Sequence, residues 1–388
     1  MTNKIIDCWQ EKKLKDISDI TSSKRIYEWE YVSSGIPFYR GKEITALKSK
    51  QKIDDFIYIS EARYNELKEK YGVPNKGDIL ITAVGTIGNA YTIENSKPFY
   101  FKDGNLLWVK NIKEHPKFLE YLFENNKKLF LGNSFGSSQH ALTISKLENL
   151  SFYFPPLDEQ KRIASTLSKI DAYLENTIKL IEEKERFKKG IAKKLLTCKK
   201  GENVPEARFK EFNDEWETKT LISVANIKKG EQKNKLDLIP NGKYPVLNGG
   251  MNFSGYYNSY NREANTITIS EGGNAGYVNF VKEKFWSSGH CYTLHDLKID
   301  KYFLYQCLKN SEKRLMKLQL GTALKNIQLS EIKEFTLDMP KSIEEQKEIG
   351  EYLSLLDAEI DNLKEQKEEI KKMKKGIMKK LMSGEVRL

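Results

Sequence analysis

Apolar residues recur every three or four positions along two long stretches of the chain, 157–196 and 343–382. This spacing places them on one face of a helix, and Glu and Lys fill the flanking positions. In the first stretch the apolar positions are Ile163, Leu167, Ile170, Leu174, Ile178, Ile181, Phe187, Ile191 and Leu195. In the second they are Ile349, Leu353, Leu356, Ile360, Leu363, Ile370, Met373, Ile377 and Leu381. The pattern predicts two long helices.

Both helices have marked starts. Pro155-Pro156 precedes the first and Pro340 the second, and acidic residues in the first turns complement the helix dipole. About 40 helical residues span ~60 Å, which is longer than a small domain is wide. An apolar stripe of that length needs a cover, and the other helix can supply it. We therefore expect the two helices to pair antiparallel as a rigid spacer.

The two helical stretches are copies of one pattern. Glu159-Gln160-Lys161 falls on Glu345-Gln346-Lys347, an offset of 186 residues, and the same offset places Lys188–Ile191 on Lys374–Ile377. Weaker correspondences precede each helix: 136–155 aligns with 321–340, and 81–88 with 269–276. Repetition at this scale fixes an architecture before any local prediction does. It predicts a pseudo-twofold arrangement of domain, helix, domain, helix.

The segments outside the helices show mixed patterns. Short β-type runs occupy 79–82, 106–109, 266–270 and 292–294, whereas 60–71 and 116–130 have helical spacing. The expected fold is α+β, with two mixed domains joined by an antiparallel coiled coil. The expected boundaries are 1–155 for the first domain, 156–198 for the first helix, 199–339 for a linker and the second domain, and 340–388 for the second helix.

Composition adds a positive charge to this picture. The 388 residues include 65 Lys and Arg against 54 Asp and Glu, a net charge of +11, and 39% are hydrophobic. We expect a folded, soluble, cytoplasmic protein, because no apolar run suits a membrane span or a secretory signal. The four cysteines are isolated, so we expect reduced thiols. The charge favours a polyanion such as DNA, although it also serves solubility.

The usual catalytic motifs are missing or weak. Neither Gly41-Lys42 nor Gly242-Lys243 completes a phosphate-binding loop. Phe154-Pro155-Pro156 is superficially similar to the Asp/Asn-Pro-Pro-aromatic motif of amino-methyltransferases, but Phe154 cannot accept a hydrogen bond from a target amino group. We interpret it as a turn that starts a helix.

Two further chemical interpretations are weak alternatives. Asp54 or Asp55 with Glu66 and Lys68 has the composition of a magnesium nuclease site, but this E-x-K spacing arises by chance in a chain that is 31% charged. The other is a metal site at His290, Cys291 and His295. On a strand Cys291 and His295 would lie ~13 Å apart, so we expect no metal there.

Polar loops that contain glycine recur at equivalent places in the two predicted domains. They are 84–90 with 272–277, 102–105 with 287–290, and 136–140 with 321–326. Equivalent loops with different hydrogen-bonding groups suit two domains that each read different base edges. Basic residues beside them suit phosphates. The candidate DNA contacts are Arg40, Lys42, Lys50, Lys52, Thr86, Asn89, Asn105, Ser138, Gln139, His140, Lys229, Lys233, Lys235, Asn274, Ser288, His290, Lys325 and Asn326.

These features together resemble the DNA specificity subunit of type I restriction–modification systems. The resemblance rests on Pro155–Ile163, on the similar start Ile343–Ile349, on Lys189-Gly190-Ile191 with Lys375-Gly376-Ile377, and on Val204–Phe209 before Trp216. It implies that each domain reads one half of a split asymmetric DNA site and that the helix pair sets the gap. It also implies a chain without catalytic residues.

The resemblance further implies partners. Two modification subunits would bind S-adenosylmethionine and methylate adenine, and restriction subunits would use ATP and magnesium, so this chain itself would bind neither a cofactor nor a metal. We expect the helices to dock the modification subunits. The candidate residues are Glu159, Gln160, Lys189, Gly190, Glu345, Gln346, Lys375 and Gly376. The alternatives are an autonomous nuclease or methyltransferase, and a coiled-coil scaffold for proteins.

Overall fold

A computed structural model describes residues 8–51, 53, 55–131, 141–321 and 325–388. The chain divides into two compact units. The first unit comprises residues 1–176 and 368–388, and the second comprises residues 177–367. Each unit therefore contains one globular domain and parts of both long helices.

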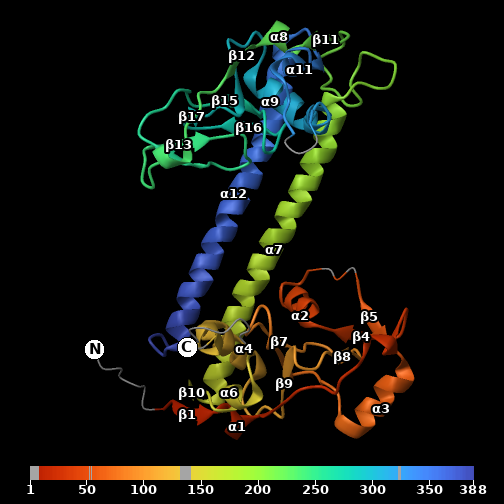
Figure 1. The fold of residues 1–388 in the computed structure, drawn as a ribbon, viewed down its shortest axis with the longest axis vertical. Coiled ribbons are helices and arrows are strands. Elements are labelled where there is room, and N and C mark those ends of the chain that lie inside the picture. The colour runs from red at the N-terminus through yellow and green to blue at the C-terminus, as the bar shows by residue number, and fades with distance from the viewer. Residues whose placement is uncertain (1–7, 52, 54, 132–140, 322–324) are drawn as a thin grey trace. The chain divides into compact units, whose positions relative to one another are not determined.

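The two predicted long helices are present, each with 40 residues. They are α7 (Leu157–Leu196) and α12 (Ile343–Met382) (Figure 1). Both carry two acidic residues in the first turn. The amide of Glu159 donates to the carbonyl of Pro156, so the proline turn leads directly into the first helical turn of α7. The predicted helix-starting role of Pro155-Pro156 is confirmed.

Within each unit, one part of α7 packs against one part of α12 in the opposite direction. In the first unit, Lys374 of α12 is 2.8 Å from Asp171 of α7. In the second unit, Lys188 of α7 is 2.6 Å from Asp357 of α12. The 186-residue offset converts one ion pair into the other. The reciprocal pairs show that the two helices run antiparallel in each unit and that the sequence repeat is also a repeat of contacts.

The described residues of the first unit form three sheets and six short helices before α7. Their orders are β1-β10, β2-β9-β6-β7 and β3-β5-β4-β8. The strands are β1 (Gln10–Lys13), β2 (Asp19–Thr21), β3 (Tyr31–Val32), β4 (Ile36–Tyr39), β5 (Ile57–Ile59), β6 (Ile79–Thr82), β7 (Ala90–Thr92), β8 (Tyr100–Phe101), β9 (Leu106–Lys110) and β10 (Ser151–Phe154). The helices are α1 (Leu14–Ile17), η1 (Glu28–Glu30, a 3₁₀ turn counted apart), α2 (Gly41–Lys48), α3 (Glu61–Tyr71), α4 (Pro116–Asn125), α5 (Lys127–Leu131) and α6 (Ile144–Glu148).

The second unit repeats this plan with different lengths. Its sheets have the orders β11-β19, β12-β18-β15-β16 and β14-β13-β17. The strands are β11 (Glu217–Thr220), β12 (Asn226–Lys229), β13 (Tyr244–Leu247), β14 (Gly255–Tyr257), β15 (Thr266–Ser270), β16 (Val278–Val281), β17 (Trp286–Ser287), β18 (Cys291–His295) and β19 (Thr336–Met339). The helices are α8 (Leu221–Val224), the 3₁₀ turn η2 (Lys235–Asp237), α9 (Lys301–Asn310), α10 (Glu312–Met316) and α11 (Leu329–Lys333).

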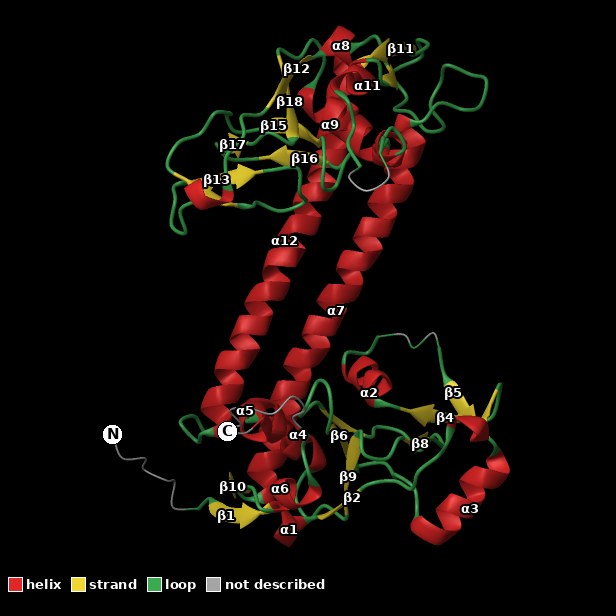
Figure 2. Cartoon of the chain, in the orientation of Figure 1, coloured by secondary structure: helices red, strands yellow, loops and turns green. Residues whose placement is uncertain are grey.

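Both units share one topology. The sheet β2-β9-β6-β7 corresponds strand for strand to β12-β18-β15-β16, and β4 pairs parallel with β8 just as β13 pairs parallel with β17. The two units differ in the segment that follows β4 in the first unit and β13 in the second. The first unit inserts α2 and α3, whereas residues 248–265, all of which the structure describes, hold only the strand β14. Helices and strands occur together in both units (Figure 2), so the predicted α+β fold with two repeated domains and long helices is confirmed.

The ends of the long helices are buried in the domain cores. In the first unit, Ile163 and Leu167 of α7 pack with Phe118 of α4, and all three are fully buried. In the second unit, Ile349 and Leu353 of α12 pack with Phe303 of α9 in the same way. The sequence predicts that the other helix covers the apolar stripe of each helix. That interpretation was incomplete, because a domain covers the first turns.

The shorter predicted elements are found with one correction. The strands predicted at 79–82 and 266–270 are β6 and β15. The single helix predicted over 116–130 is wrong, because two helices, α4 and α5, meet at Asn126. The Asn126 amide group donates to the carbonyl of Leu122, so this side chain ends α4 by occupying one of its last backbone acceptors.

Buried Glu and Gln side chains attach each long helix to its domain. The Gln160 amide donates to the Pro155 carbonyl, and its oxygen accepts from the backbone of His115. Gln346 repeats both contacts with Pro340 and Asp300. A buried amide satisfied on both sides fixes the angle at which the helix leaves the domain.

The neighbouring glutamates are held by arginines from equivalent places. Glu345 accepts two hydrogen bonds from Arg208, both 2.8 Å long, and one from the Trp216 indole at 3.2 Å. Glu159 accepts two from Arg387, at 2.8 and 2.6 Å. The backbone hydrogen bonds beside the two arginines also match. Ala207 donates to the Lys194 carbonyl and Val386 to the Lys380 carbonyl, so both segments fold back onto the helix end before them.

The two arginines differ in exposure, and this gives a testable difference. The Arg208 side chain is 11% exposed and the Arg387 side chain 42%. Arg208→Ala leaves the Glu345 carboxylate buried without its cation, so we expect a loss of about 3 kcal/mol in unfolding free energy. Arg387→Ala costs less, because water can hydrate Glu159. Urea denaturation of the full chain measures both, with the exposed Arg186→Ala as control. Equal losses for Arg208→Ala and Arg186→Ala would contradict the role of the buried pair.

Candidate nucleic-acid interface

The predicted loop equivalence is present in the backbone hydrogen bonds. The loop after β6 is closed by Gly88 donating to Thr82, and the loop after β15 by Gly276 donating to Ser270, both at 2.8 Å. The residue directly before the neighbouring strand of the sheet, β9 or β18, accepts a second matching hydrogen bond in each unit. Ala83 donates to the carbonyl of Asn105 at 2.8 Å, and Glu271 donates to the carbonyl of His290 at 2.9 Å. The same scaffold thus holds different side chains.

In the second unit, the candidate loops meet. The amide of Asn274 donates to the carbonyl of Gly249, and the amide of Ser288 donates to the carbonyl of Leu247. The Ser288 hydroxyl accepts from the backbone of Lys233 at 3.0 Å. Asn326 stands close to Gly272, because a Cβ atom built on that glycine would lie 2.5 Å from the Asn326 side-chain oxygen. The structure therefore brings Asn274, Ser288, His290 and Asn326 together at the carboxyl end of β15.

Glu271 is the electrostatic centre of this cluster, and the sequence reasoning missed it. Its carboxylate lies 2.6 Å from the Lys229 ammonium and 3.4 Å from Nδ1 of His290, and it accepts a 2.7 Å hydrogen bond from the Tyr292 hydroxyl. Burial alone would raise the pKa of Glu271, but the hydrogen bonds from Lys229 and Tyr292 outweigh burial and lower it. Burial and the Glu271 charge raise the pKa of Tyr292.

In the first unit, Ala83 occupies the place of Glu271, and the loop is held differently. The Thr82 hydroxyl donates to the carbonyl of Thr86, whose side chain is exposed. The Asn89 amide donates to the Thr45 hydroxyl at 3.2 Å and accepts from the Lys127 ammonium. Burial, followed by the nearby charge of Lys48, lowers the pKa of Lys127. No sequence pattern marked Lys127, because it reaches Asn89 only through the tertiary fold.

Several basic candidates are already paired with carboxylates. Arg40 donates to the buried Glu43 at 2.8 Å, and this pair starts α2. For Glu43, hydrogen bonds from Arg40 outweigh burial and lower the pKa of its carboxyl. Lys42 lies 3.6 Å from Asp55, and Lys50 lies 2.5 Å from Glu175. Phosphate contacts from these side chains would compete with ion pairs inside the unit.

Other basic candidates differ in their surroundings. The Lys233 ammonium lies 4.1 Å from the ring centroids of both Tyr257 and Trp286, a geometry that favours a cation–π interaction. Lys235 and Lys325 are exposed. Lys52, Ser138, Gln139 and His140 lie outside the described residues.

The candidate partner-binding residues fall into two sets. Glu159, Gln160, Glu345 and Gln346 are at most 3% exposed, with the internal contacts given above. Lys189, Gly190, Lys375 and Gly376 are exposed. A Cβ atom built on either glycine would have no neighbour within 4 Å. The helix surface around these glycines is open to another protein.

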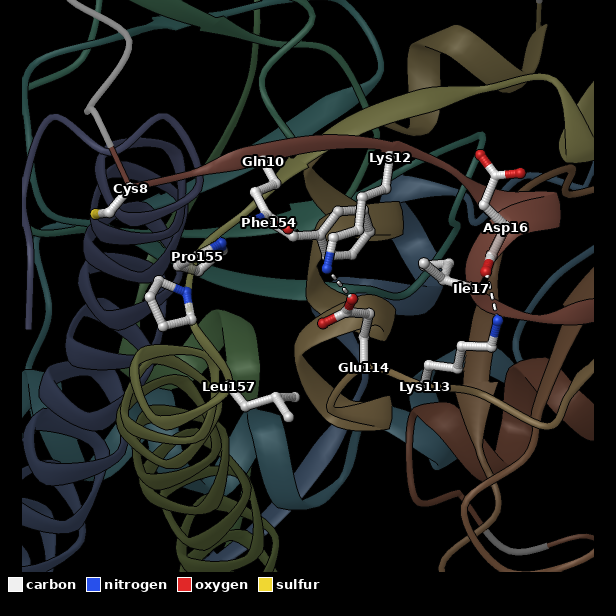
Figure 3. Close-up of a pocket in the computed structure, with 11 residues that line it drawn as sticks. Cys8, Gln10, Lys12, Asp16, Ile17, Lys113, Glu114, Phe154, Pro155 and Leu157 are labelled. Atoms are coloured by element: carbon white, nitrogen blue, oxygen red, sulfur yellow. Dashed lines mark hydrogen bonds and ion pairs between the residues drawn. The ribbon is translucent and has the colours of Figure 1, made fainter.

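A cavity of about 500 Å³ lies where β1 meets the start of α7 in the first unit. Figure 3 shows its lining, in which the Lys12 ammonium contacts the Glu114 carboxylate at 2.7 Å and Lys113 donates to the backbone of Asp16. Glu114 also accepts from the buried Gln160 amide. The Pro155-Pro156 motif belongs to this wall and serves the helix start, as the sequence predicted.

The alternative catalytic sites do not assemble. Asp54 lies outside the described residues. The Asp55 side chain is 86% exposed, and Glu66 is paired with Arg63 and Lys70. Burial raises the pKa of Cys291 to about 11, which disfavours the thiolate that a metal needs. In the described part of the chain, no group of three His, Cys, Asp or Glu side chains suits a metal ion, and no helix is long and apolar enough to cross a membrane.

The fold and the loops define a class: a two-domain binding protein built by internal duplication, in which equivalent loops carry different polar side chains. The family model for the type I restriction modification DNA specificity domain matches residues 6–183 and 213–372. The chain belongs to this family, as its sequence motifs suggested.

Individual relatives agree with the family assignment. A protein named as a type I specificity subunit from Mycoplasma pneumoniae is 39% identical over 174 residues, 44% of this chain and 46% of that protein. One from Mycoplasma genitalium is 34% identical over 154 residues, 39% of this chain and 40% of that protein. This chain thus spans less than half the length of these two relatives. The type I restriction enzyme MjaVIII specificity subunit of Methanocaldococcus jannaschii is 26% identical over 433 residues, 99% of this chain and 98% of that protein.

Solved structures share the fold. The S subunit of a type I restriction-modification system from M. genitalium has a TM-score of 0.67 at 19% identity, covering 98% of both chains. A chain from an assembly of the type I R-M system has a TM-score of 0.58 at 14% identity, covering 99% of this chain and 100% of that chain.

Two glycines in the loop after β6 allow the cost of a left-handed backbone to be measured apart from the cost of a steric clash. Gly85 and Gly88 have φ of +76° and +80°. A Cβ atom on Gly88 would lie 2.5 Å from the buried Phe130 ring, whereas one on Gly85 would meet nothing within 4 Å. We expect Gly85→Ala to cost about 1 kcal/mol for its left-handed backbone and Gly88→Ala about 3 kcal/mol for backbone and clash together. Urea denaturation measures the difference. Equal costs would show that the loop does not pack on Phe130 as described.

Proposed function

We propose that this chain is the noncatalytic DNA-reading subunit of a type I restriction–modification complex, and that each domain reads one half of a split, asymmetric site. The observation that carries the proposal is the duplicated loop scaffold. Matching backbone hydrogen bonds hold Ala83 and Asn105 in one unit, and Glu271 and His290 in the other. Side chains that differ on a common scaffold are what two half-sites of different sequence require, because base edges are distinguished by donor and acceptor patterns.

The proposal assigns the domains to residues 1–155 and 199–339, and the helices to 156–198 and 340–388. The DNA contacts are drawn from the loop candidates, of which Asn274, His290 and Asn326 lie together in the second unit. Ser288 lies beside them, but it is fully buried and holds the backbone of Lys233 in place of DNA. Lys229 contacts phosphate only if DNA competes with Glu271 for its ammonium. The names of the relatives support the assignment, since they describe specificity subunits.

Two modification subunits would dock on equivalent surfaces around Lys189-Gly190 and Lys375-Gly376. These residues are exposed at equivalent positions of the two helices. This supports the docking of two modification subunits, because two copies of one partner need the same kind of surface twice. The modification subunits would bind S-adenosylmethionine, and restriction subunits would use ATP and magnesium. The complex would act on DNA in the cytoplasm.

Sequencing of methylated bases in the host genome, with and without the gene for this chain, tests the function directly. We expect a split motif of methylated adenines that disappears with the gene. Exchange of residues 1–155 for the matching domain of another family member should change one half-site and leave the other unchanged. Methylation by the purified chain alone, or a change in both half-sites, would contradict the proposal.

A second test concerns the gap between the half-sites. Seven residues inserted into both α7 and α12 lengthen each helix by ~10.5 Å with little rotation, which corresponds to about three base pairs of DNA. We expect the gap to grow by about that amount while both half-sites keep their sequences. An insertion of the same length in the linker at 200–203 is the control and should leave the gap unchanged. A changed half-site in the helix variant would show that the helices do more than set distance.

A further inference from the structure

Each unit presents an apolar side chain at the middle of a three-residue 3₁₀ turn. Trp29 of η1 is 78% exposed and Leu236 of η2 is 97% exposed. The two turns occupy equivalent places. η1 follows β2 and η2 follows β12. Each turn also precedes a strand that contains proline, β4 or β13, and this strand pairs parallel with β8 or β17. The same exposed feature thus occurs twice on scaffolds whose other loops have diverged.

A side-chain hydrogen bond fixes the backbone of each turn, and the apolar residue at its middle faces solvent. The carboxylate of the third residue accepts from the backbone of the residue before the turn. Glu30 accepts from Tyr27 at 2.8 Å, and Asp237 accepts from Asn234 at 3.2 Å. Trp29 is held further by stacking on Tyr27, with ring centroids 4.2 Å apart and planes 8° apart. Because this stacking holds the Trp29 ring in its outward position, the side chain loses little conformational entropy when it binds.

The segment before each turn runs along the equivalent candidate loop. In the first unit, the Ser22 hydroxyl donates to the Leu106 carbonyl at 3.0 Å and Ser23 donates to Phe101 at 2.6 Å. In the second unit, Glu231 donates to the Ser287 carbonyl at 2.9 Å, and Lys233 donates to the Ser288 hydroxyl. The segments that lead into both turns therefore border loops to which the proposed function assigns base contacts, and Glu30 of η1 also pairs with Arg63 of α3 at 2.8 Å.

Single exposed apolar side chains are common, and a protein-binding hot spot normally lies inside a ring of contacts that excludes water. Here charged residues flank each apolar one: Glu28 and Glu30 beside Trp29, and Lys235 and Asp237 beside Leu236. An apolar wedge in DNA needs no such ring, because one side chain placed against a base step displaces water and unstacks the step. The tip at η1 is Trp29 stacked on the exposed Tyr27, and the tip at η2 is Leu236; each offers one apolar end of a size that fits a base step.

We propose that Trp29 and Leu236 are paired apolar wedges, each of which contacts a base or sugar at the border of the half-site read by its own domain. This inference rests on the proposed function. It adds a contact that carries no charge and no hydrogen bond. Trp29 presents a ring that extends the stack begun by Tyr27, and Leu236 presents a branched aliphatic end of the kind that enters base steps.

The experiment uses the full chain with its modification subunit and a duplex that carries the split motif found by methylome sequencing. Trp29→Ala and Leu236→Ala are each expected to weaken binding about five- to tenfold. The slope of log affinity against log salt should stay unchanged, because no phosphate contact is lost. Lys235→Ala, by contrast, should reduce that slope if Lys235 contacts phosphate. Ile222→Ala and Tyr153→Ala, which remove other exposed apolar side chains, are the matched controls and should bind as the wild type does.

Position along the DNA gives an independent measurement. 2-Aminopurine is placed in turn at each base of the two half-sites and their borders. Wild-type binding should raise its fluorescence at one position beside each half-site, and each variant should abolish the rise at one border only. Thermal unfolding of the variants verifies that they fold, which is expected for side chains so exposed.

The failures can be told apart. If no split motif depends on the gene, the proposed function itself is wrong. If the motif exists and both variants bind and unstack DNA as the wild type does, the wedges are wrong while the function stands. If the variants bind DNA normally but no longer copurify with the modification subunit, the two turns are protein-docking sites and the proposal is overturned.

Discussion

Burial of the first turns of α7 and α12 in the domain cores is the constraint on which the rest of each unit depends. Ile163 and Leu167 complete the core of one domain, and Ile349 and Leu353 that of the other. A helix that forms part of a close-packed core cannot rotate or slide without opening cavities. The buried Gln160 and Gln346 add directional hydrogen bonds to that packing. Helix and domain therefore behave as one rigid piece within each unit.

Duplication explains why the polar motif at the helix start occurs twice and why each copy is held by an arginine that follows the end of a long helix. Arg208 lies between the end of α7 and the second domain, and Arg387 follows the end of α12. Both return to a glutamate in the first turn of the opposite helix. The chain thus uses the same contact twice with different solvent exposure. The stability of each half depends on how far water reaches the carboxylate.

Several of the chain's cations are engaged in ion pairs inside the units. Lys188 and Lys374 join the helices, Arg40 starts α2, and Lys229 balances Glu271. A net charge of +11 is therefore a poor guide to which cations meet DNA. Side chains held by carboxylates within the fold contribute to binding only when phosphate replaces those carboxylates. The apolar tips Trp29 and Leu236 have no such competition.

The sequence by itself determined the two long helices, the 186-residue repeat and the strands β6 and β15, because periodicity and duplication are properties of sequence order. It also located the equivalent loops. Only the tertiary structure decided which loop residues meet. Glu271 and Lys127 carried no sequence signal, since their partners lie up to 42 and 38 residues away. Likewise, the sequence marked Glu159 and Glu345 as a motif, but only the fold revealed that both are buried against arginines. Spacing along a chain predicts which face a residue occupies, and the packing of distant segments decides what that face contacts.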